Sequence, residues 1–368
     1  MKNIIYIGGF ELPDKNAAAQ RVMANAKLLR EMGFEVSFIG ISKDMQKAPS
    51  NVDGFVSNPI PYPTGTKHWI HQIVTFVDAQ SIIEKKTDYV ILYNFPSIAS
   101  LRILKACHKH GIKVIHDLTE WESSKGWSPR EIIRKIDINL RMHYCMKRMD
   151  GVIAISRYLY EYYKKYTNTI FVPPTVDLTD KKWNHERSIS TGEKIKLVYA
   201  GNAGFGVKDR LDIIINSVTR FPDMQLDVIG MTREQYELGY GIKLADVSNL
   251  TFHGRVSHTE AILTVQDADF QFLIRDCNLK NNAGFPTKFV ESLACCTPII
   301  ATLTSNIGDF LKDGENGFIV DDKRPLDDVL KFISKLSSTD IIRMKEICRN
   351  CHSFDYREFK SSFKQLFK

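Results

Sequence analysis

The sequence predicts an α/β protein built from two Rossmann-like domains. Short β-branched and apolar runs alternate with amphipathic helical windows along the 368 residues, and this alternation is typical of parallel sheets covered by helices. A segment rich in structure-breaking residues separates two such series near the middle of the chain. The composition, 43% hydrophobic and 25% charged, is that of a globular chain in which each half can bury its own core.

Five strands are expected in each half. In the first half they are residues 3–7, 35–39, 89–93, 113–116 and 151–155. In the second half they are residues 195–200, 225–229, 250–253, 270–274 and 298–301. A helix is expected over residues 18–32, because an amphipathic window there is closed by Gly33.

The boundary between the domains is placed by composition. Pro173 and Pro174 are followed by the polar stretch 178–194, which has little to bury and is expected to be a linker. The predicted domains are therefore residues 1–178 and 179–354.

Cysteines and apolar runs bear on the compartment. The seven cysteines are scattered and odd in number, which suits a reducing compartment. Cys348 and Cys351 form a C-x-x-C with His352 beside it, but no second ligand pair at comparable spacing accompanies them, so no metal site is expected. No apolar run reaches the roughly 18 residues of a spanning helix, and the run 4–10 is too short for a secretory signal. A cytoplasmic chain is expected.

The positive charge is concentrated in the first half. Residues 1–175 hold 24 basic and 16 acidic residues, and residues 176–368 hold 26 and 27. The first half is therefore expected to meet an anionic partner, either a phosphorylated acceptor or the inner face of the cytoplasmic membrane. The helix-like run 127–148 is the expected peripheral membrane contact, the alternative being a solvated basic face over an ordinary core stripe. Nucleic acid is not expected, because no zinc-finger, RNP or basic-zipper pattern is present.

The segment 284–302 combines a turn, a helix start that carries Lys288 and Glu291, and a buried strand. This is the layout of a nucleotide-sugar pocket at a helix N-terminus, because the first amides of a helix favour a phosphate. Residues 285–294 resemble the donor-site segment of retaining family 4 glycosyltransferases, which have the GT-B fold of two domains facing each other across a cleft. The resemblance implies that the helix amides face the donor diphosphate and that Glu291 holds the nucleotide ribose. The donor-binding residues that it implies here are Phe285, Pro286, Thr287, Lys288 and Glu291.

A glycine pair, Gly8 and Gly9, follows the first strand. Glycine lets the backbone come close to a ligand, and the pattern is not G-x-G-x-x-G, which counts against a dinucleotide site. In the resembled family this loop lies under the donor phosphates, which places Gly9 in the donor site. The alternative is a tight turn that needs glycine for its geometry alone.

A second glycine-rich turn begins at Gly201. The resembled family has a glycine here, usually followed by Arg, and a Lys about six residues on, and both cations hold the diphosphate. Lys208 matches that Lys, Asn202 stands in place of the Arg, and Arg275 is expected to supply the missing charge from the carboxyl end of its strand. Lys208 and Arg275 would stabilise the departing nucleoside diphosphate in the transition state, so that no metal or other cofactor is needed. The alternatives are a solvated loop lysine and an interdomain salt bridge.

The sequence departs from the family pattern near this segment. Relatives carry two glutamates separated by seven residues, but Ala283 stands eight positions before Glu291. Asn281 and Asn282 are expected to take over the contact with the sugar. Cys296 occupies the usual glycine after the helix, so a non-glycine residue must tolerate that helix end.

Acceptor residues are expected after the fourth strand, where His116, Asp117, Glu120 and Trp121 follow one another closely. Sugars stack on Trp and hydrogen-bond to carboxylates. His116 resembles the family's histidine near the donor sugar, and Asp117 or Glu120 would assist the acceptor hydroxyl. The structural alternative is that Asp117 and Glu120 cap the next helix.

The resemblance covers the chain from its first strand to its tail, residues 355–368, which is similar to the C-terminal helix that returns to the first domain in this family. It implies a retaining transferase that moves a sugar from a nucleoside-diphosphate donor to a hydroxyl of a glycan or lipid-linked acceptor, in surface polysaccharide assembly. Two alternatives stay open: a non-hydrolysing nucleotide-sugar epimerase, and a catalytically silent nucleotide-sugar-binding scaffold.

Overall fold

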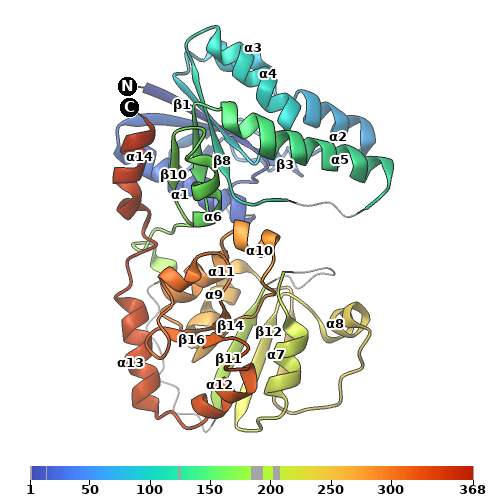
Figure 1. Ribbon diagram of the computed structural model, residues 1–368, viewed down its shortest axis with the longest axis vertical. Helices are drawn as coiled ribbons and strands as arrows, with labels where there is room; N and C mark the ends of the chain where they lie inside the picture. Colours follow the sequence, from blue (N-terminus) through green and yellow to red (C-terminus); the bar gives the residue numbers. More distant parts are fainter. Residues whose placement is uncertain (1, 14, 123–125, 184–193, 202–207, 368) are drawn as a thin grey trace. The chain divides into compact units, whose positions relative to one another are not determined.

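The computed structural model describes residues 2–13, 15–122, 126–183, 194–201 and 208–367 (Figure 1). The chain forms two compact units. The first holds residues Met1–Thr175, Ala283–Phe285 and Tyr356–Lys368, and the second holds Val176–Asn282 and Pro286–Asp355.

The first unit is built on an eight-stranded sheet. In spatial order its strands are β10 (Thr169–Phe171), β9 (Gly151–Ala154), β8 (Lys113–Leu118), β7 (Tyr89–Tyr93), β1 (Lys2–Gly8), β2 (Phe34–Ile39), β5 (Phe55–Ser57) and β4 (Asn51–Val52). Every pair is parallel except β4 with β5. Two short strands, β3 (Ile41–Ser42) and β6 (Ile60–Pro61), pair separately. The central strands are buried, because helices cover both faces of a parallel sheet.

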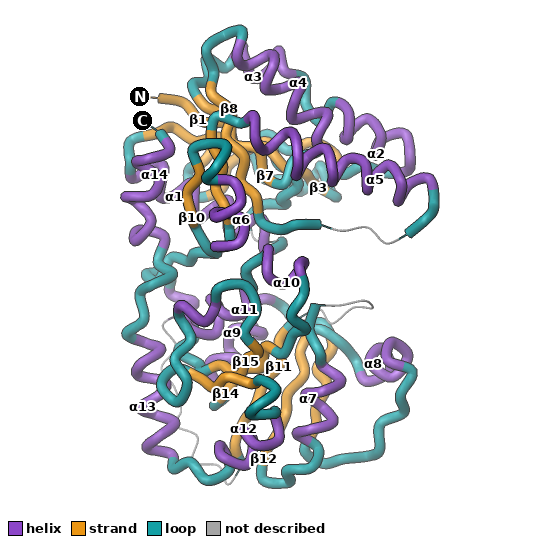
Figure 2. Tube along the Cα trace, viewed as in Figure 1, coloured by secondary structure: helices purple, strands orange, loops and turns teal. Residues whose placement is uncertain are grey.

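Helices of the first unit lie on both faces of this sheet (Figure 2). They are α1 (Ala17–Glu31), α2 (Gly65–Val74), α3 (Ala79–Glu84), α4 (Ser97–His108), α5 (Pro129–Leu140), α6 (Arg157–Tyr163) and α14 (Lys360–Leu366). The tail helix α14 belongs to this unit: Phe363, Leu366 and Phe367 lie in its core, and the Phe367 ring is 5.1 Å from that of Phe34.

The second unit has a six-stranded sheet in which every pair is parallel. Its order is β13 (Leu250–Gly254), β12 (Met224–Ile229), β11 (Ile195–Ala200), β14 (Phe270–Leu273), β15 (Ile299–Thr302) and β16 (Gly317–Val320). Its helices are α7 (Leu211–Val218), α8 (Arg233–Tyr240), α9 (His258–Asp267), α10 (Leu279–Ala283, whose last residue is counted with the first unit), α11 (Thr287–Ala294), α12 (Leu326–Ile333) and α13 (Ser338–Arg349).

The strands and the helix expected from the sequence are present, with ends that shift by one or two residues. The predicted linker differs from expectation in one respect. Trp183 within it is buried and packs with Val198 and Ile229 in the core of the second unit, so this part of the polar stretch is anchored. The remainder of that stretch up to residue 193 lies outside the described residues.

In the part of the chain that the structure describes, no helix combines the length and the apolar character that a bilayer-crossing segment needs.

Candidate functional site

Four polar side chains meet at the carboxyl edge of the sheet in the second unit. Tyr199 lies near the end of β11, Asp209 follows the turn after that strand, Arg275 follows β14, and Lys288 lies in the first turn of α11. Because β11 and β14 are adjacent and parallel, their carboxyl ends lie on the same edge, and this edge is where α/β folds bind ligands. We call these four residues the Asp209 cluster.

Asp209 is the centre of this cluster. Its Oδ1 accepts a hydrogen bond from Arg275 Nε at 2.5 Å, and its Oδ2 accepts one from the Tyr199 hydroxyl at 2.8 Å and a short one from Lys288 Nζ. Lys288 Nζ also lies 3.0 Å from the Tyr199 hydroxyl and 4.2 Å from the centre of its ring. The side chains of Asp209, Arg275 and Lys288 are only 3%, 10% and 14% exposed. Two cations thus share one buried carboxylate.

The electrostatics of the cluster keep it charged. Burial alone would raise the pKa of Asp209, but the positive charges of Lys288 and Arg275 outweigh burial and hold that pKa well below its usual range. Burial lowers the pKa of Lys288, and the Asp209 carboxylate opposes that shift. Burial, with the Asp209 charge, raises the pKa of Tyr199, which therefore stays protonated as a hydrogen-bond donor. The cluster carries one surplus positive charge.

Gly201 makes room for the lysine. A Cβ atom at Gly201 would lie 2.0 Å from Lys288 Nζ, which is far inside contact distance. Any side chain at this position would displace the ammonium group. The glycine predicted to let a ligand approach therefore also lets Lys288 reach Asp209.

Glu291 lies three residues after Lys288 on the same face of α11. Its Oε1 is 3.8 Å from Nε2 of His258, and its side chain is 28% exposed. The structure thus places Glu291 beside the Asp209 cluster with an accessible carboxylate. At the start of α11, Pro286 is the N-cap, and among the described residues no side chain caps the amides of the first turn, which begins at Thr287. Phe285 is counted with the first unit.

The remaining predicted donor residues have varied surroundings. Lys208 directly precedes Asp209 in the chain, and Asn202 lies outside the described residues. Asn282 Oδ1 accepts a hydrogen bond from the Ser305 amide at 3.0 Å, and Asn281 donates to the Asp276 carbonyl at 2.8 Å. Both asparagines therefore brace loops at this edge of the sheet.

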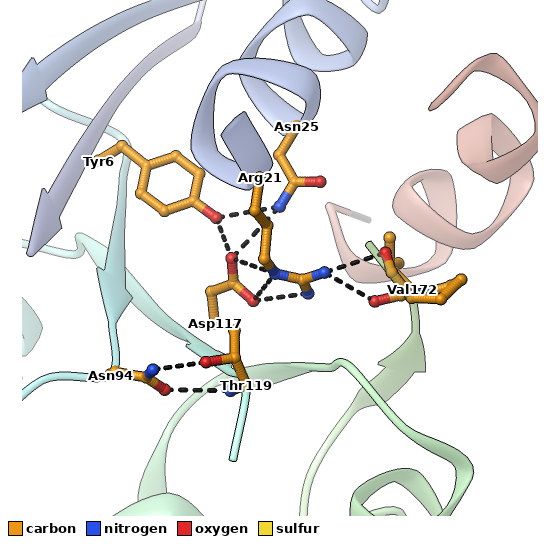
Figure 3. A network of polar contacts seen from close by, with 8 residues as sticks. Tyr6, Arg21, Asn25, Asn94, Asp117, Thr119 and Val172 are labelled. Carbon is orange, nitrogen blue, oxygen red and sulfur yellow. Dashed lines mark hydrogen bonds and ion pairs between the residues drawn. The ribbon is translucent and has the colours of Figure 1, made fainter. Parts of the chain in front are cut away.

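A second buried network lies in the first unit and is centred on Asp117 (Figure 3). Arg21 of α1 donates to both carboxylate oxygens, with Nη2 2.7 Å from Oδ1, and its Nη1 donates to the Val172 carbonyl at 2.9 Å. Tyr6 and Asn25 also donate to Asp117 Oδ2. Asp117 is completely buried, so in this arrangement it joins β8 to α1 and to the end of β10 and does not face solvent.

His116 is also completely buried. Its Nε2 accepts a hydrogen bond from the Phe95 amide at 3.1 Å. Burial, together with the charge of Arg141, lowers the pKa of His116 to about 3, so the ring is neutral at ordinary pH. Glu120, by contrast, is partly exposed. It follows Thr119, whose hydroxyl accepts from Asn94 Nδ2 at 2.5 Å and whose amide donates to Asn94 Oδ1 at 3.0 Å (Figure 3).

Two other predicted residues of the first unit, Gly9 and Trp121, differ in their surroundings. Gly9 is exposed, and a Cβ atom there would have nothing within 4 Å, whereas one at Gly8 would lie 2.7 Å from Tyr93. Trp121 is half-buried in an aromatic cluster, with ring centres 5.2 Å from Tyr162 and 5.3 Å from His143.

The structure therefore brings together Arg275, Lys288 and Glu291 among the predicted donor residues. Asp209 and Tyr199 were missed as site residues, and so was Arg21 in the first unit. The only local signal for Asp209 is that it follows Lys208 in the glycine-rich turn. The catalytic roles predicted for His116, Asp117, Glu120, Lys208 and Arg275 stay predictions.

The parallel sheets and the two Rossmann-like domains match solved structures of the GT-B fold. Sucrose-phosphate synthase from Thermosynechococcus elongatus is similar with a TM-score of 0.72 and 13% identity, over 100% of this chain and 98% of that one. Anabaena Alr3699/HepE in complex with UDP-glucose is similar with a TM-score of 0.65 and 12% identity, over 100% and 99%. The predicted fold class is confirmed.

For most of the second unit, the sequence itself matches a known family. Residues 181–350, a little less than half of the chain, match the model of the family described as glycosyl transferases group 1. A protein of Methanocaldococcus jannaschii named as an uncharacterized glycosyltransferase is 24% identical over 206 residues. That alignment covers 54% of this chain and 53% of the relative, about half of each.

Proposed function

We propose that this chain is a glycosyltransferase that moves a sugar from a nucleoside-diphosphate donor to a hydroxyl of a glycan or lipid-linked acceptor. The match of residues 181–350 to group 1 glycosyl transferases supports the reaction class. The donor class is supported by the structurally similar Anabaena protein, whose structure is described as a complex with UDP-glucose.

The observation that carries this proposal is the Asp209 cluster. Its two buried cations, Lys288 and Arg275, share one carboxylate at the carboxyl edge of a parallel sheet, beside the start of α11. The surplus positive charge of the cluster and the amides at the N-terminus of α11 both favour a diphosphate.

The roles of the individual groups follow from the chemistry. As the bond between the sugar and the diphosphate breaks, negative charge grows on the phosphate oxygen, and fixed cations stabilise it most in the transition state. Lys288 and Arg275 would supply those cations, and Lys208 would add a third from the preceding turn. Glu291 would accept hydrogen bonds from the two ribose hydroxyls, because an ionised carboxylate is a good acceptor for vicinal donors. This account needs no metal, so metal independence is part of the proposal.

On the acceptor side, the proposal assigns roles to three residues. Glu120, which is partly exposed and lies two residues after β8, would face the acceptor hydroxyl, while buried His116 and Asp117 would act by holding that strand end in place. Retention of the anomeric configuration, with the departing phosphate as the base, is proposed from the family resemblance. Surface polysaccharide assembly is proposed as the setting on the same ground. A peripheral membrane contact through residues 127–148 is a separate proposal, since it depends on the surface of the first unit.

The proposal is tested by incubating the purified chain with a panel of UDP-, GDP- and dTDP-sugars. Release of free nucleoside diphosphate supports a transferase, and the anomeric signal of the product, read by nuclear magnetic resonance, decides retention. A changed sugar with the nucleotide still attached would indicate an epimerase. Thermal stabilisation by a nucleotide sugar without any turnover would indicate a silent binder.

A further inference from the structure

The exposed side of α5 is apolar, which is unusual for a surface helix. Ile132, Ile133 and Ile136 are 43%, 40% and 61% exposed, and their spacing places them on one face. Trp127, just before the helix, is 85% exposed. Ile138 is buried, and Asp137, which borders the isoleucines, is engaged by the amide and hydroxyl of Ser97. The helix therefore has a second apolar side that no described part of the protein covers.

Cations and aromatic rings border this apolar side. Lys135 lies 4.4 Å from the centre of the Trp127 ring, and Arg130 lies 4.9 Å from that of Trp69 on α2. Both α2 and α5 pack against α4, and they lie on the same face of the sheet (Figure 2). On α2, Ile70 is 44% exposed and Lys67 lies one turn earlier. We call this surface, formed by Lys67, Ile70, Trp127, Arg130, Ile132, Ile133, Lys135 and Ile136, the α2–α5 face.

The sequence indicated residues 127–148 as one continuous basic segment, but the two parts of this segment differ in burial. Arg141, Met142, Cys145 and Met146 are buried, and Arg141 forms an ion pair with Glu122 at 3.0 Å. Much of the second part of the run is therefore core. Tyr144, which is 43% exposed, and Arg148 beside its ring are still accessible there, but the exposed aliphatic side chains of the run lie on α5.

We propose that the α2–α5 face docks on the surface of an anionic phospholipid bilayer, with Trp127 and the three isoleucines entering the headgroup boundary and Arg130, Lys135 and Lys67 meeting lipid phosphates. Apolar side chains flanked by Trp, Lys and Arg are the composition of helices that lie in a membrane interface. The first half of the chain, with 24 basic and 16 acidic residues, adds long-range attraction of the same sign.

Charge decides between a bilayer and a second copy of this chain. A symmetric dimer would bring Arg130 and Lys135 of one copy against the same cations of the other, and like charges across an interface are unfavourable. Both acidic residues of α5 are withdrawn from the face, since Asp137 binds Ser97 and Glu131 is half-buried beside Gly126. Among the described residues that form the α2–α5 face, the charged ones, Lys67, Arg130 and Lys135, are therefore all cations. The biological role of this docking, which would be to bring a transferase to a lipid-linked acceptor, rests on the proposed function.

The test is co-sedimentation of the full chain with vesicles of phosphatidylcholine alone and with a minority of phosphatidylglycerol. The wild type is expected to bind the anionic vesicles and to be released by salt, because screening weakens the electrostatic part. The double variant Ile132→Gln, Ile136→Gln is expected to bind them roughly tenfold more weakly, because two inserted side chains are lost. The double variant Arg130→Gln, Lys135→Gln is expected to lose the preference for anionic vesicles.

The matched controls are Leu238→Gln with Phe332→Gln and Lys47→Gln with Lys331→Gln, which change exposed residues elsewhere and should bind as the wild type does. Wild-type binding by the Ile132, Ile136 variant would overturn the proposal. So would a dimer that this variant dissociates, with no vesicle binding by either form. Release of nucleoside diphosphate, measured on the same preparations without vesicles, keeps the two proposals apart: turnover without vesicle binding overturns only the docking surface, and vesicle binding without turnover overturns only the proposed reaction.

Discussion

Lys288 is the residue on which the proposed chemistry depends most. It is buried, bonded to Asp209 and Tyr199, and placed where charge would grow on a departing diphosphate. Lys288→Met removes the charge and keeps the length of the side chain, and Arg275 remains to pair with Asp209. We expect kcat to fall by about 100-fold to 1,000-fold, the scale of losing one preorganised transition-state contact, with a smaller change in KM.

Steady-state kinetics of nucleoside diphosphate release measures this effect. Lys331→Met changes an exposed lysine of the same unit and should leave both constants unchanged. An increase in KM alone would show that Lys288 only anchors the ground-state phosphate.

Glu291 offers an independent test of the nucleotide site. Its carboxylate is accessible and lies one turn from Lys288. Glu291→Ala should weaken nucleotide binding by on the order of 1 to 3 kcal/mol, the scale of charge-assisted hydrogen bonds. Titration calorimetry with a nucleoside diphosphate measures the change, and Glu315→Ala is a control on the same unit. An unchanged Kd would remove Glu291 from the site.

His116 makes the stability of the first unit depend on pH. Its pKa is lowered from 6.5 to about 3 by burial, so the folded state holds the neutral ring and the unfolded state binds the proton first. The stabilisation is complete above pH 6.5 and is lost as the pH falls toward 3, at about 1.4 kcal/mol for each pH unit.

Urea unfolding at several pH values between 4 and 7 checks this dependence. His116→Gln should remove this part of the slope, because Gln can still accept from the Phe95 amide but does not titrate. His110→Gln changes an exposed histidine and should keep the slope. A slope that is the same in all three proteins would contradict the assignment.

The residues that the sequence did not reveal share a physical reason. Asp209 meets Lys288 across 79 positions, and Arg21 meets Asp117 across 96. Neither pair leaves a periodicity or a local motif, because the contact exists only after two separate βα units pack into one sheet. The sequence pointed to Lys288, Glu291 and Gly201 because each belongs to a short segment with a recognisable pattern, and their roles in binding stay predictions.

At the scale of elements, local pattern predicted the central strands of both sheets, four to seven residues long, and missed the edge strands β10 and β16. Residues 89–93 form a continuous apolar run, which is typical of a strand buried on both faces, and residues 195–200 form an apolar run interrupted only by the exposed Lys196. β10 and β16 are three and four residues long, and their pairing depends on neighbours that are distant in sequence. At β16, a Cβ on Gly317 would lie 2.1 Å from the Ile299 carbonyl, a constraint that only the packed sheet shows.

The end of α11 illustrates a departure that the sequence did reveal. Cys296 follows this helix with φ of 52°, in the left-handed region that favours glycine. Its amide donates to the Leu293 carbonyl at 2.8 Å, and the Thr297 amide donates to that of Ser292 at 2.8 Å, so the turn closes the helix despite the side chain. A non-glycine residue therefore occupies a glycine position, as expected.

Cys296→Gly should relieve the strain of that conformation and raise the free energy of unfolding by about 0.5 to 1 kcal/mol, set against the added freedom of the unfolded chain. Urea denaturation measures the change. Cys296→Ala keeps the Cβ and removes the sulfur, so it should show no such gain. Equal stability of the Gly and Ala variants would show that the backbone is not strained there.

At the scale of the whole molecule, the two units are joined by more than one passage of the chain. The chain leaves the first unit after Thr175 and returns to it at Tyr356. Tyr356 donates to Glu31 at 2.5 Å, and Phe363 is completely buried in the core of the first unit. The last helix thus stabilises the unit that the first residues begin, so the first core is complete only when the whole chain is present.

Phe363→Ala tests this closure. Removing a fully buried ring should destabilise the first unit by about 3 to 5 kcal/mol, because a cavity is left in its core. A chain of two units need not unfold in one step, so scanning calorimetry can show two transitions. The first unit is identified as the transition whose midpoint temperature a nucleoside diphosphate does not raise, and this midpoint should fall in Phe363→Ala. The transition that the nucleotide does raise reports the second unit and should stay in place. Phe332→Ala, at a ring that is 49% exposed on α12, is the matched control and should cost far less. Loss of the nucleotide-sensitive transition in Phe363→Ala would show that the tail supports both units and that they do not unfold separately.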